Sequence, residues 1–259
     1  KQMTACLTMP ADASAEKRYP IYLTFHGHTY FPRNGSVVKA SDAYVDKAIY
    51  LDVNPFGVVN GKDPEYYKNT ISKEILPRPS YPYRHWDDRE KVSFNEIFLR
   101  VVRGLQYAKT RPEWDGKNLA VIGSSMGGAQ ALVAAALDPQ VTACVANVPA
   151  MGEMSVATPG WAGWPILAAN VQGVNPEVLH KNAAYYDAVN FARQIKAPTL
   201  VGVGFNDRVC PPPSIYAIYN SLQGPKKIAV SPTGGHTWNA SSPSWLPLAS
   251  CNDRLTTFA

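Results

Sequence analysis

Short apolar runs alternate with longer amphipathic stretches along most of the chain. Seven runs are rich in β-branched or aromatic residues and have the length of strands. They cover residues 3–9, 20–27, 48–54, 118–123, 141–149, 198–206 and 227–234. The last four are short continuous apolar runs, which is typical of buried parallel strands. The pattern therefore predicts a mostly parallel central sheet.

Helical periodicity appears between these runs. Residues 91–109 carry apolar side chains at helical spacing, from Phe94 to Ala108, and predict a helix packed on the sheet. Residues 127–137 are apolar all round and predict a buried helix, and residues 212–222 follow a proline and predict another. The alternation indicates the α/β class, with helices on both faces of the sheet.

Two segments interrupt this rhythm. Residues 54–90 are rich in proline, and residues 150–180 contain TPGWAGWP, so we interpret both as irregular, lid-like insertions. A chain of 259 residues fits one large domain. We therefore expect residues 1–259 to form a single domain, processed or excised from a longer chain.

The composition indicates which kinds of binding partner to expect. The net charge is +5, and the basic residues are scattered, which does not favour a nucleic-acid partner. No apolar run approaches the roughly 18–20 residues of a membrane helix, so no membrane span is expected. The sequence leaves open whether the chain forms a homo-oligomer.

Four cysteines are too few for a disulfide scaffold and lack the spacing of a metal site. We expect no metal and no cofactor. Cys6 and Cys144 lie in strand-like runs and are predicted to be buried thiols, whereas Cys210 and Cys251 lie in loop-like sequence and could pair if the protein is exported.

Candidate chemistry begins with VIGSSMGGAQ at residues 121–130, where two adjacent serines lie between glycines. Only Ser125 has glycines two residues before and after it, Gly123 and Gly127. This is the Gly-x-Ser-x-Gly spacing of a nucleophile elbow, a sharp turn between a strand and a helix. A strand is predicted before it and a helix after it. Ser125, and not Ser124, is therefore the candidate nucleophile.

A serine hydroxyl needs a neighbouring base, and the base needs an acid that orients it. In chains with this elbow the acid and then the histidine follow the serine. His236 follows the last predicted strand in a glycine-flanked loop, whereas His180 lies in a predicted surface helix over residues 175–192. Asp207 directly follows a predicted strand and is preferred to Asp187, which the same surface helix would place mid-helix. The candidates are Asp207 and His236.

A tetrahedral intermediate also requires N–H donors for its oxyanion. We expect the backbone N–H groups of Met126, directly after the candidate nucleophile, and of His28, in the loop where Gly27 permits a turn. His26 and His28 could instead be a metal pair, but no third ligand lies near them in the sequence. The oxyanion interpretation is therefore preferred.

Together these residues resemble the acetyl xylan esterase / cephalosporin-C deacetylase family, carbohydrate esterase family seven. Similar stretches include FHGH, FLRVVRGLQYA, VIGSSMGGAQALVAAAL and DRVCPPPSIYAIYN. The resemblance implies an α/β-hydrolase fold and removal of acetyl groups from sugar hydroxyls. It implies Ser125, Asp207 and His236 as a catalytic triad and His28 and Met126 as backbone donors.

The chain departs from the family pattern at several positions. Met126 stands where the family usually has Gln, and Thr237 stands where it has Glu. DVNPFG replaces an Arg-Gly-Gln motif, and residues 54–90 and 150–180 do not match closely. These differences fall on elements that shape the family's pocket and its oligomer.

The expected substrate is a carbohydrate ester such as acetylated xylan, and Trp161, Trp164 and Trp238 are candidate sugar contacts. The same triad would serve a general carboxylesterase or a peptidase. A carbohydrate-binding module with a vestigial triad is the alternative outside enzymes. We expect a secreted or periplasmic protein, with the cytoplasm as the alternative.

Overall fold

The computed structural model describes residues 3–28, 46–71, 73 and 79–237. Within these ranges, seven strands form one sheet. They are β1 Ala5–Thr8, β2 Tyr19–Phe25, β3 Ile49–Val53, β4 Trp114–Ser124, β5 Ala143–Asn147, β6 Thr199–Gly204 and β7 Lys226–Ser231. Each of them overlaps one of the predicted apolar runs.

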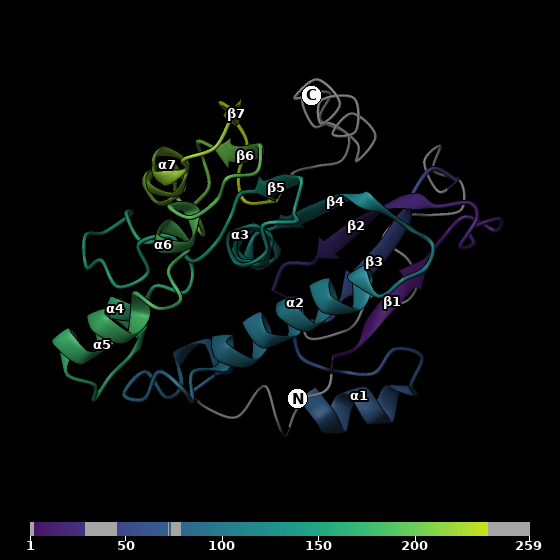
Figure 1. Cartoon of the computed structure of the whole chain (residues 1–259). Coiled ribbons are helices and arrows are strands. Elements are labelled where there is room, and N and C mark those ends of the chain that lie inside the picture. Colours follow the sequence, from purple (N-terminus) through teal and green to yellow (C-terminus); the bar gives the residue numbers. More distant parts are fainter. Residues whose placement is uncertain (1–2, 29–45, 72, 74–78, 238–259) are drawn as a thin grey trace.

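The strand order is β1-β3-β2-β4-β5-β6-β7 (Figure 1). β1 runs antiparallel to β3, and every other neighbouring pair is parallel. The prediction of a mostly parallel sheet is therefore confirmed. Because parallel strands end at the same edge, the loops after β2, β4, β6 and β7 can meet although they lie far apart in the sequence.

The position of a strand in the sheet decides the burial of its cysteine. β1 is an edge strand, and its Cys6 is only partly buried, so the prediction of a buried thiol is wrong there. Cys144 lies in the interior strand β5 and is fully buried, as is Cys210 after β6. Cys251 lies outside the described residues, so its pairing with Cys210 stays a prediction.

The described α-helices are α1 Pro64–Thr70, α2 Ser93–Lys109, α3 Met126–Leu137, α4 Leu167–Asn170, α5 Pro176–Ala183, α6 Ala188–Ala192 and α7 Pro212–Ser221. α2, α3 and α7 match the three predicted helices between strands. α2 packs against α3, α3 against α6 and α6 against α7, so these four form one layer on the sheet (Figure 1). Helices on the other face stay a prediction.

The main hydrophobic core lies between the sheet and this helix layer. α2 buries the apolar face that the sequence predicts, including Phe94, Val101 and Leu105. α3 is buried almost all round, because helices and strands surround it. This packing fixes the first turn of α3 next to the end of β4.

Both insertions contain helices, so the expectation of irregular segments is wrong in part. α1 lies within residues 54–90, where Asp63 accepts the backbone N–H of Tyr66 at 2.7 Å and Pro64 occupies the first turn. A proline is tolerated there because the first N–H groups of a helix have no partner within it. α4 and the first part of α5 lie within residues 150–180.

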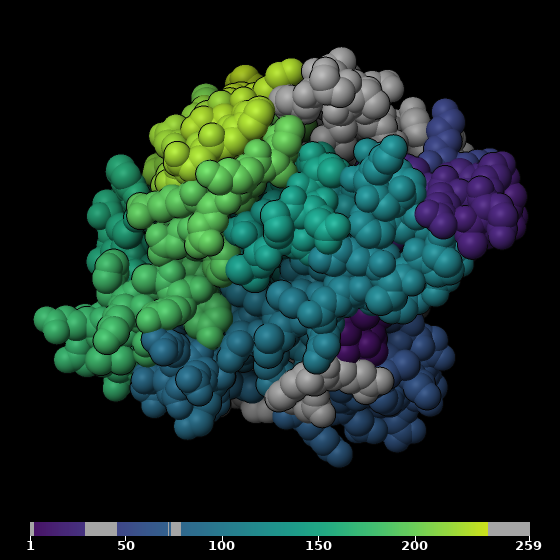
Figure 2. All heavy atoms as spheres, in the orientation of Figure 1, coloured from purple at the N-terminus to yellow at the C-terminus, as the bar shows by residue number. Residues whose placement is uncertain are grey.

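The first insertion packs against the chain that follows the second. The side-chain amide of Asn182 donates to the Trp86 carbonyl at 2.8 Å, and the Tyr186 hydroxyl donates to the Arg89 carbonyl. The Arg89 guanidinium also lies 4.3 Å from the ring centre of Tyr185. Figures 1 and 2 show that residues 79–90, the later part of the first insertion, lie beside α5 at one end of the molecule, whereas α1 lies away from it.

In the part of the chain that is described, no helix has both the length and the apolar character required to span a membrane.

Candidate active site

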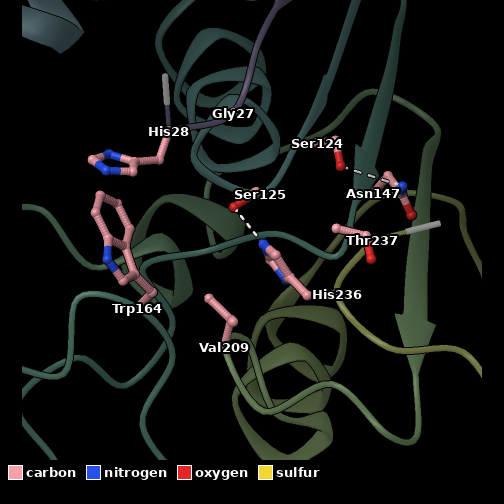
Figure 3. Close-up of a pocket in the computed structure, with 9 residues that line it drawn as sticks. All are labelled: Gly27, His28, Ser124, Ser125, Asn147, Trp164, Val209, His236 and Thr237. Atoms are coloured by element: carbon pink, nitrogen blue, oxygen red, sulfur yellow. Dashed lines mark hydrogen bonds between the residues drawn. The ribbon is translucent and has the colours of Figure 1, made fainter. Parts of the chain in front are cut away.

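Ser125 joins β4 to α3 in a strained backbone conformation. Its φ of 58° and ψ of −124° lie outside the regions that non-glycine residues usually adopt. Three backbone hydrogen bonds hold it: its N–H donates to Asn147 at 2.9 Å, and its carbonyl accepts from Ala129 at 3.1 Å and from Ala150 at 3.0 Å. The turn presents the Ser125 side chain to a cavity (Figure 3).

Close packing explains the two glycines of the motif. A Cβ atom on Gly123 would lie 2.1 Å from the Gly127 carbonyl oxygen, and one on Gly127 would lie 2.0 Å from the Phe25 carbonyl oxygen. Backbone atoms at these positions cannot move without separating the helix from the strands. The Gly-x-Ser-x-Gly pattern is therefore a steric requirement of this turn.

A continuous row of hydrogen bonds joins three of the predicted residues. Ser125 Oγ lies 2.8 Å from His236 Nε2 (Figure 3). His236 Nδ1 lies 2.8 Å from Asp207 Oδ2. The Asp207 side chain is fully buried, and its Oδ1 accepts the backbone N–H groups of Val209 at 2.8 Å and Cys210 at 2.9 Å. A buried carboxylate fixed in this way can orient an imidazole and stabilise its protonated form.

The loops after β6 and β7 are tied together, and this brings His236 to Asp207. The N–H of Phe205 donates to Ser231 at 3.0 Å, and that of Asn206 donates to Gly234 at 2.9 Å. A Cβ on Gly204 would lie 2.5 Å from the Gly234 oxygen, so the two loops are in contact. The lack of a side chain at Gly204 allows this approach.

A cavity of about 500 Å³ opens beside Ser125 Oγ. Its lining residues are Gly27, His28, Ser124, Ser125, Asn147, Trp164, Val209, His236 and Thr237 (Figure 3). His28 and Trp164 lie on one side of Ser125, and the polar residues Ser124, Asn147 and Thr237 lie on the other. The side-chain amide of Asn147 donates to Ser124 Oγ at 3.3 Å. The cavity thus has an aromatic wall and a polar wall.

The three candidate tryptophans differ in position. Trp164 lines the cavity, whereas Trp161 is 47% exposed and is not among the lining residues. Trp238 lies outside the described residues. The segment after β5 links Trp164 to the elbow. The N–H of Ala150 donates to the Ser125 carbonyl, and the N–H of the next residue, Met151, donates to the Trp164 carbonyl at 2.7 Å.

The two candidate oxyanion donors flank Ser125. Met126 is the first residue of α3 and is fully buried, and His28 lies at the exposed rim of the cavity. Desolvation by the surrounding protein lowers the pKa of the His28 imidazole, so its ring is neutral at neutral pH. Within residues 3–28, 46–71, 73 and 79–237, no three His, Cys, Asp or Glu side chains form a potential metal-binding group.

Sequence reasoning missed two residues of this region. Asn147 ends β5 at the same sheet edge as Ser125, and a polar residue at the end of a predicted parallel strand is a signal that could have found it. Tyr81 contacts both His28 and Met126 from within the first insertion. The path of that insertion, which the sequence pattern does not give, determines this contact.

Asp187, the alternative candidate for the acid, does not take part in the hydrogen-bonded row of Ser125, His236 and Asp207. It lies at the N-terminus of α6 and not in mid-helix, because the predicted helix over residues 175–192 is divided into α5 and α6. Its carboxylate accepts the N–H groups of Met154 at 3.1 Å and Val189 at 3.0 Å. Burial raises the pKa of Asp187 to about 6, although these two N–H groups favour the charged form.

This raised pKa predicts a pH-dependent stability. Between pH 3.8, the ordinary pKa of an aspartate, and about pH 6, folded Asp187 keeps a proton that the unfolded chain releases. The free energy of unfolding should therefore fall as pH rises through this window, by on the order of 3 kcal/mol from this group. Urea unfolding from pH 4 to 7 measures the slope. If Asp187→Asn shows the same pH slope as the wild type, this assignment is wrong.

A family model described as acetyl xylan esterase (AXE1) matches residues 1–242. The chain belongs to the acetyl xylan esterase (AXE1) family. The resemblance seen in the sequence is therefore confirmed, and the AXE1 chain is a member of a family of carboxylic ester hydrolases.

One curated relative of this AXE1 chain is acetyl esterase Axe7A of Xylanibacter ruminicola, with 41% identity over 160 residues. The match covers 61% of the AXE1 chain and 36% of the relative, so the chain spans about a third of that relative's length.

Solved structures similar to the AXE1 chain include acetyl xylan esterase 1 from Thermoanaerobacterium sp. JW/SL YS485, with a TM-score of 0.75 and 24% identity over 98% of this chain and 79% of the other. The acetyl xylan esterase from Paenibacillus sp. R4 has a TM-score of 0.70 and 22% identity over 97% and 75%. An acylaminoacyl peptidase from Pyrococcus horikoshii has a TM-score of 0.62 and 18% identity over 98% and 38%. These likenesses show the α/β-hydrolase fold.

Proposed function

We propose that this chain is a serine esterase that removes acetyl groups from carbohydrates, such as acetylated xylan or xylo-oligosaccharides. The observation that carries the proposal is the hydrogen-bonded row of Ser125, His236 and Asp207 beside an open cavity in a member of the AXE1 family. Relatives named acetyl esterase and acetyl xylan esterase support acetate as the acyl group.

In the proposed acylation step, Ser125 Oγ attacks the ester carbonyl carbon. The proton of Oγ passes to Nε2 of His236, which lies 2.8 Å away. Asp207 keeps the other ring nitrogen protonated and stabilises the imidazolium that forms. The tetrahedral intermediate then collapses, and Nε2 gives its proton to the oxygen of the leaving sugar.

The oxyanion of this intermediate needs donors that are already in place. In the proposal these are the backbone N–H groups of Met126 and His28, from the two segments that flank Ser125. They stabilise charge that appears only when the carbonyl carbon becomes tetrahedral, so they lower the barrier more than they tighten binding.

Deacylation uses the same groups in reverse. Nε2 of His236 accepts a proton from water, the hydroxide attacks the acetyl carbonyl, and Ser125 leaves with the proton returned from His236. The products are acetate and regenerated enzyme.

The direct test is mass detection of acetate released from acetylated xylan and from acetylated monosaccharides. Aminoacyl nitroanilides and longer-chain aryl esters serve as competing substrates. We expect sugar acetates to be preferred. Preferred cleavage of the nitroanilides would indicate a peptidase instead. Preferred cleavage of long-chain esters would indicate a general carboxylesterase.

Trp164 is proposed as the sugar contact, because it is the candidate tryptophan that lines the cavity within the described residues. Trp164→Ala should lower kcat/KM for acetylated oligosaccharides roughly ten- to a hundredfold, the size of one aromatic stacking contact. Hydrolysis of a small aryl acetate should change little, since it needs only the triad and the oxyanion donors. Steady-state kinetics on both substrates measure the difference.

Trp161→Ala is the matched control, because this exposed residue does not line the cavity. It should leave both substrates unaffected. If Trp164→Ala lowers both activities together with the melting temperature, Trp164 acts through packing and the sugar contact is wrong.

A further inference from the structure

The Tyr81 hydroxyl lies between the side chains of the two residues proposed as oxyanion donors. Its oxygen is 2.5 Å from Nδ1 of His28 and 3.4 Å from Sδ of Met126. The hydroxyl has one proton, which it donates to the Met126 sulfur, and it accepts from Nδ1 of His28 when that nitrogen carries the ring proton, so it bridges the imidazole and the thioether in the Nδ1–H tautomer. The bridge connects the loop after β2 to the first turn of α3.

Tyr81 is itself fixed in place. It is 3% exposed, and its ring packs edge-on against Phe56 at 4.8 Å and against Phe94 at 6.2 Å. The same ring stacks on His28 with centroids 5.4 Å apart. A packed aromatic side chain has few accessible rotamers, so the hydroxyl is held at a defined point.

The two donors differ in how firmly their own surroundings hold them. Met126 is fully buried at the start of α3, whereas His28 is exposed at the cavity rim and follows the flexible residue Gly27. The stacked Tyr81 ring and its hydroxyl anchor the His28 side chain, and through it the His28 backbone. The position of the His28 N–H relative to Met126 therefore depends on Tyr81.

We propose that Tyr81 is a positioning residue for the oxyanion hole. It acts through His28 and Met126, holding their backbone N–H groups at the spacing that receives the oxyanion. The inference rests on the proposed esterase function. Small displacements of such donors have large kinetic effects, because they stabilise charge only at the transition state.

Tyr81→Phe tests this role, because it removes the hydroxyl and keeps the packed ring. On a small aryl acetate we expect kcat to fall about tenfold, less than the loss from deleting a donor outright, with KM nearly unchanged. The inhibition constant of methylboronic acid should rise by about the same factor, because its tetrahedral serine adduct places an oxygen in the oxyanion hole. The melting temperature should stay close to that of the wild type.

Tyr67→Phe is the matched control. Tyr67 is also buried in the first insertion, but its hydroxyl donates to the Val59 carbonyl and accepts the Lys62 N–H, both at 3.0 Å, within that same insertion. It should leave kcat and boronate inhibition unchanged. Met126→Leu removes the sulfur that accepts from Tyr81, and its effect combined with Tyr81→Phe should be less than additive.

The outcomes separate the two proposals. If the wild type hydrolyses the aryl acetate through Ser125 and Tyr81→Phe leaves kcat and boronate inhibition unchanged, the role of Tyr81 is overturned and the esterase function stands. If Tyr81→Phe raises KM and lowers the melting temperature without weakening boronate inhibition, Tyr81 is only structural and the proposal is also overturned. A wild type that hydrolyses no ester would overturn the proposed function itself.

Discussion

Replacing Ser125 by alanine is expected to lower kcat by about 10⁴-fold or more, because the acyl-enzyme can no longer form. Alanine retains Cβ, so the positive φ of 58° at this position should be as costly as in the wild type, and stability should change little. Acetate release under saturating substrate measures the loss, and thermal unfolding checks that the fold is intact.

Ser124→Ala is the matched control for this substitution. Ser124 lines the same cavity and accepts a hydrogen bond from Asn147, but it does not contact His236 in the described hydrogen bonds. The variant should retain most of its activity on a small aryl acetate. Equal losses from the two serines would mean that the nucleophile has been assigned incorrectly.

Asp207→Asn is expected to lower kcat by a similar factor, about 10⁴-fold. Oδ1 of Asp207 already accepts two backbone N–H groups, from Val209 and Cys210, so the asparagine should turn its oxygen to them. Its NH₂ group would then face Nδ1 of His236, 2.8 Å from the replaced oxygen. The imidazole must accept there and carry its proton on Nε2, where it can no longer take the proton of Ser125.

The pair Asp207→Asn and Asp187→Asn separates a catalytic loss from a loss of folding. Asp187 binds the backbone of Met154 and Val189 and is not among the residues that line the cavity, so its substitution should change stability and leave kcat largely intact. Near-normal turnover by Asp207→Asn would mean that another residue is the acid that orients His236.

Regular patterns made the sheet and the elbow predictable. Residues such as Val121 and Val145 lie in apolar runs of strand length, and such runs pair in a parallel sheet whatever the details of their neighbours. The elbow was predictable because the steric need for Gly123 and Gly127 restricts the sequence itself. The order of the strands then brings the loops that carry Asp207 and His236 to the serine.

Positions that depend on loop paths could not be predicted. The prolines in residues 54–90 predict an irregular segment, yet Pro64 begins α1 because Asp63 caps the helix. The sequence pattern predicts Asp187 inside one helix, but its side chain caps a second helix, α6. Tyr81 carries no local signal, since its role depends on the distant residues that it meets.

Both insertions support the aromatic wall of the cavity, because Tyr81 packs against its two residues, His28 and Trp164. The two insertions are therefore the unit in which the family's loops can be exchanged. Tyr81 comes from the first insertion and Trp164 from the second, and their rings meet edge-on with centroids 6.4 Å apart. If only one insertion were replaced by the corresponding loop of a relative, the new loop would contact an insertion whose residues fit a different surface. Recombination that alters specificity should therefore transfer residues 54–90 and 150–187 as a pair, with the hydrogen bond from Asn182 to Trp86 carried along.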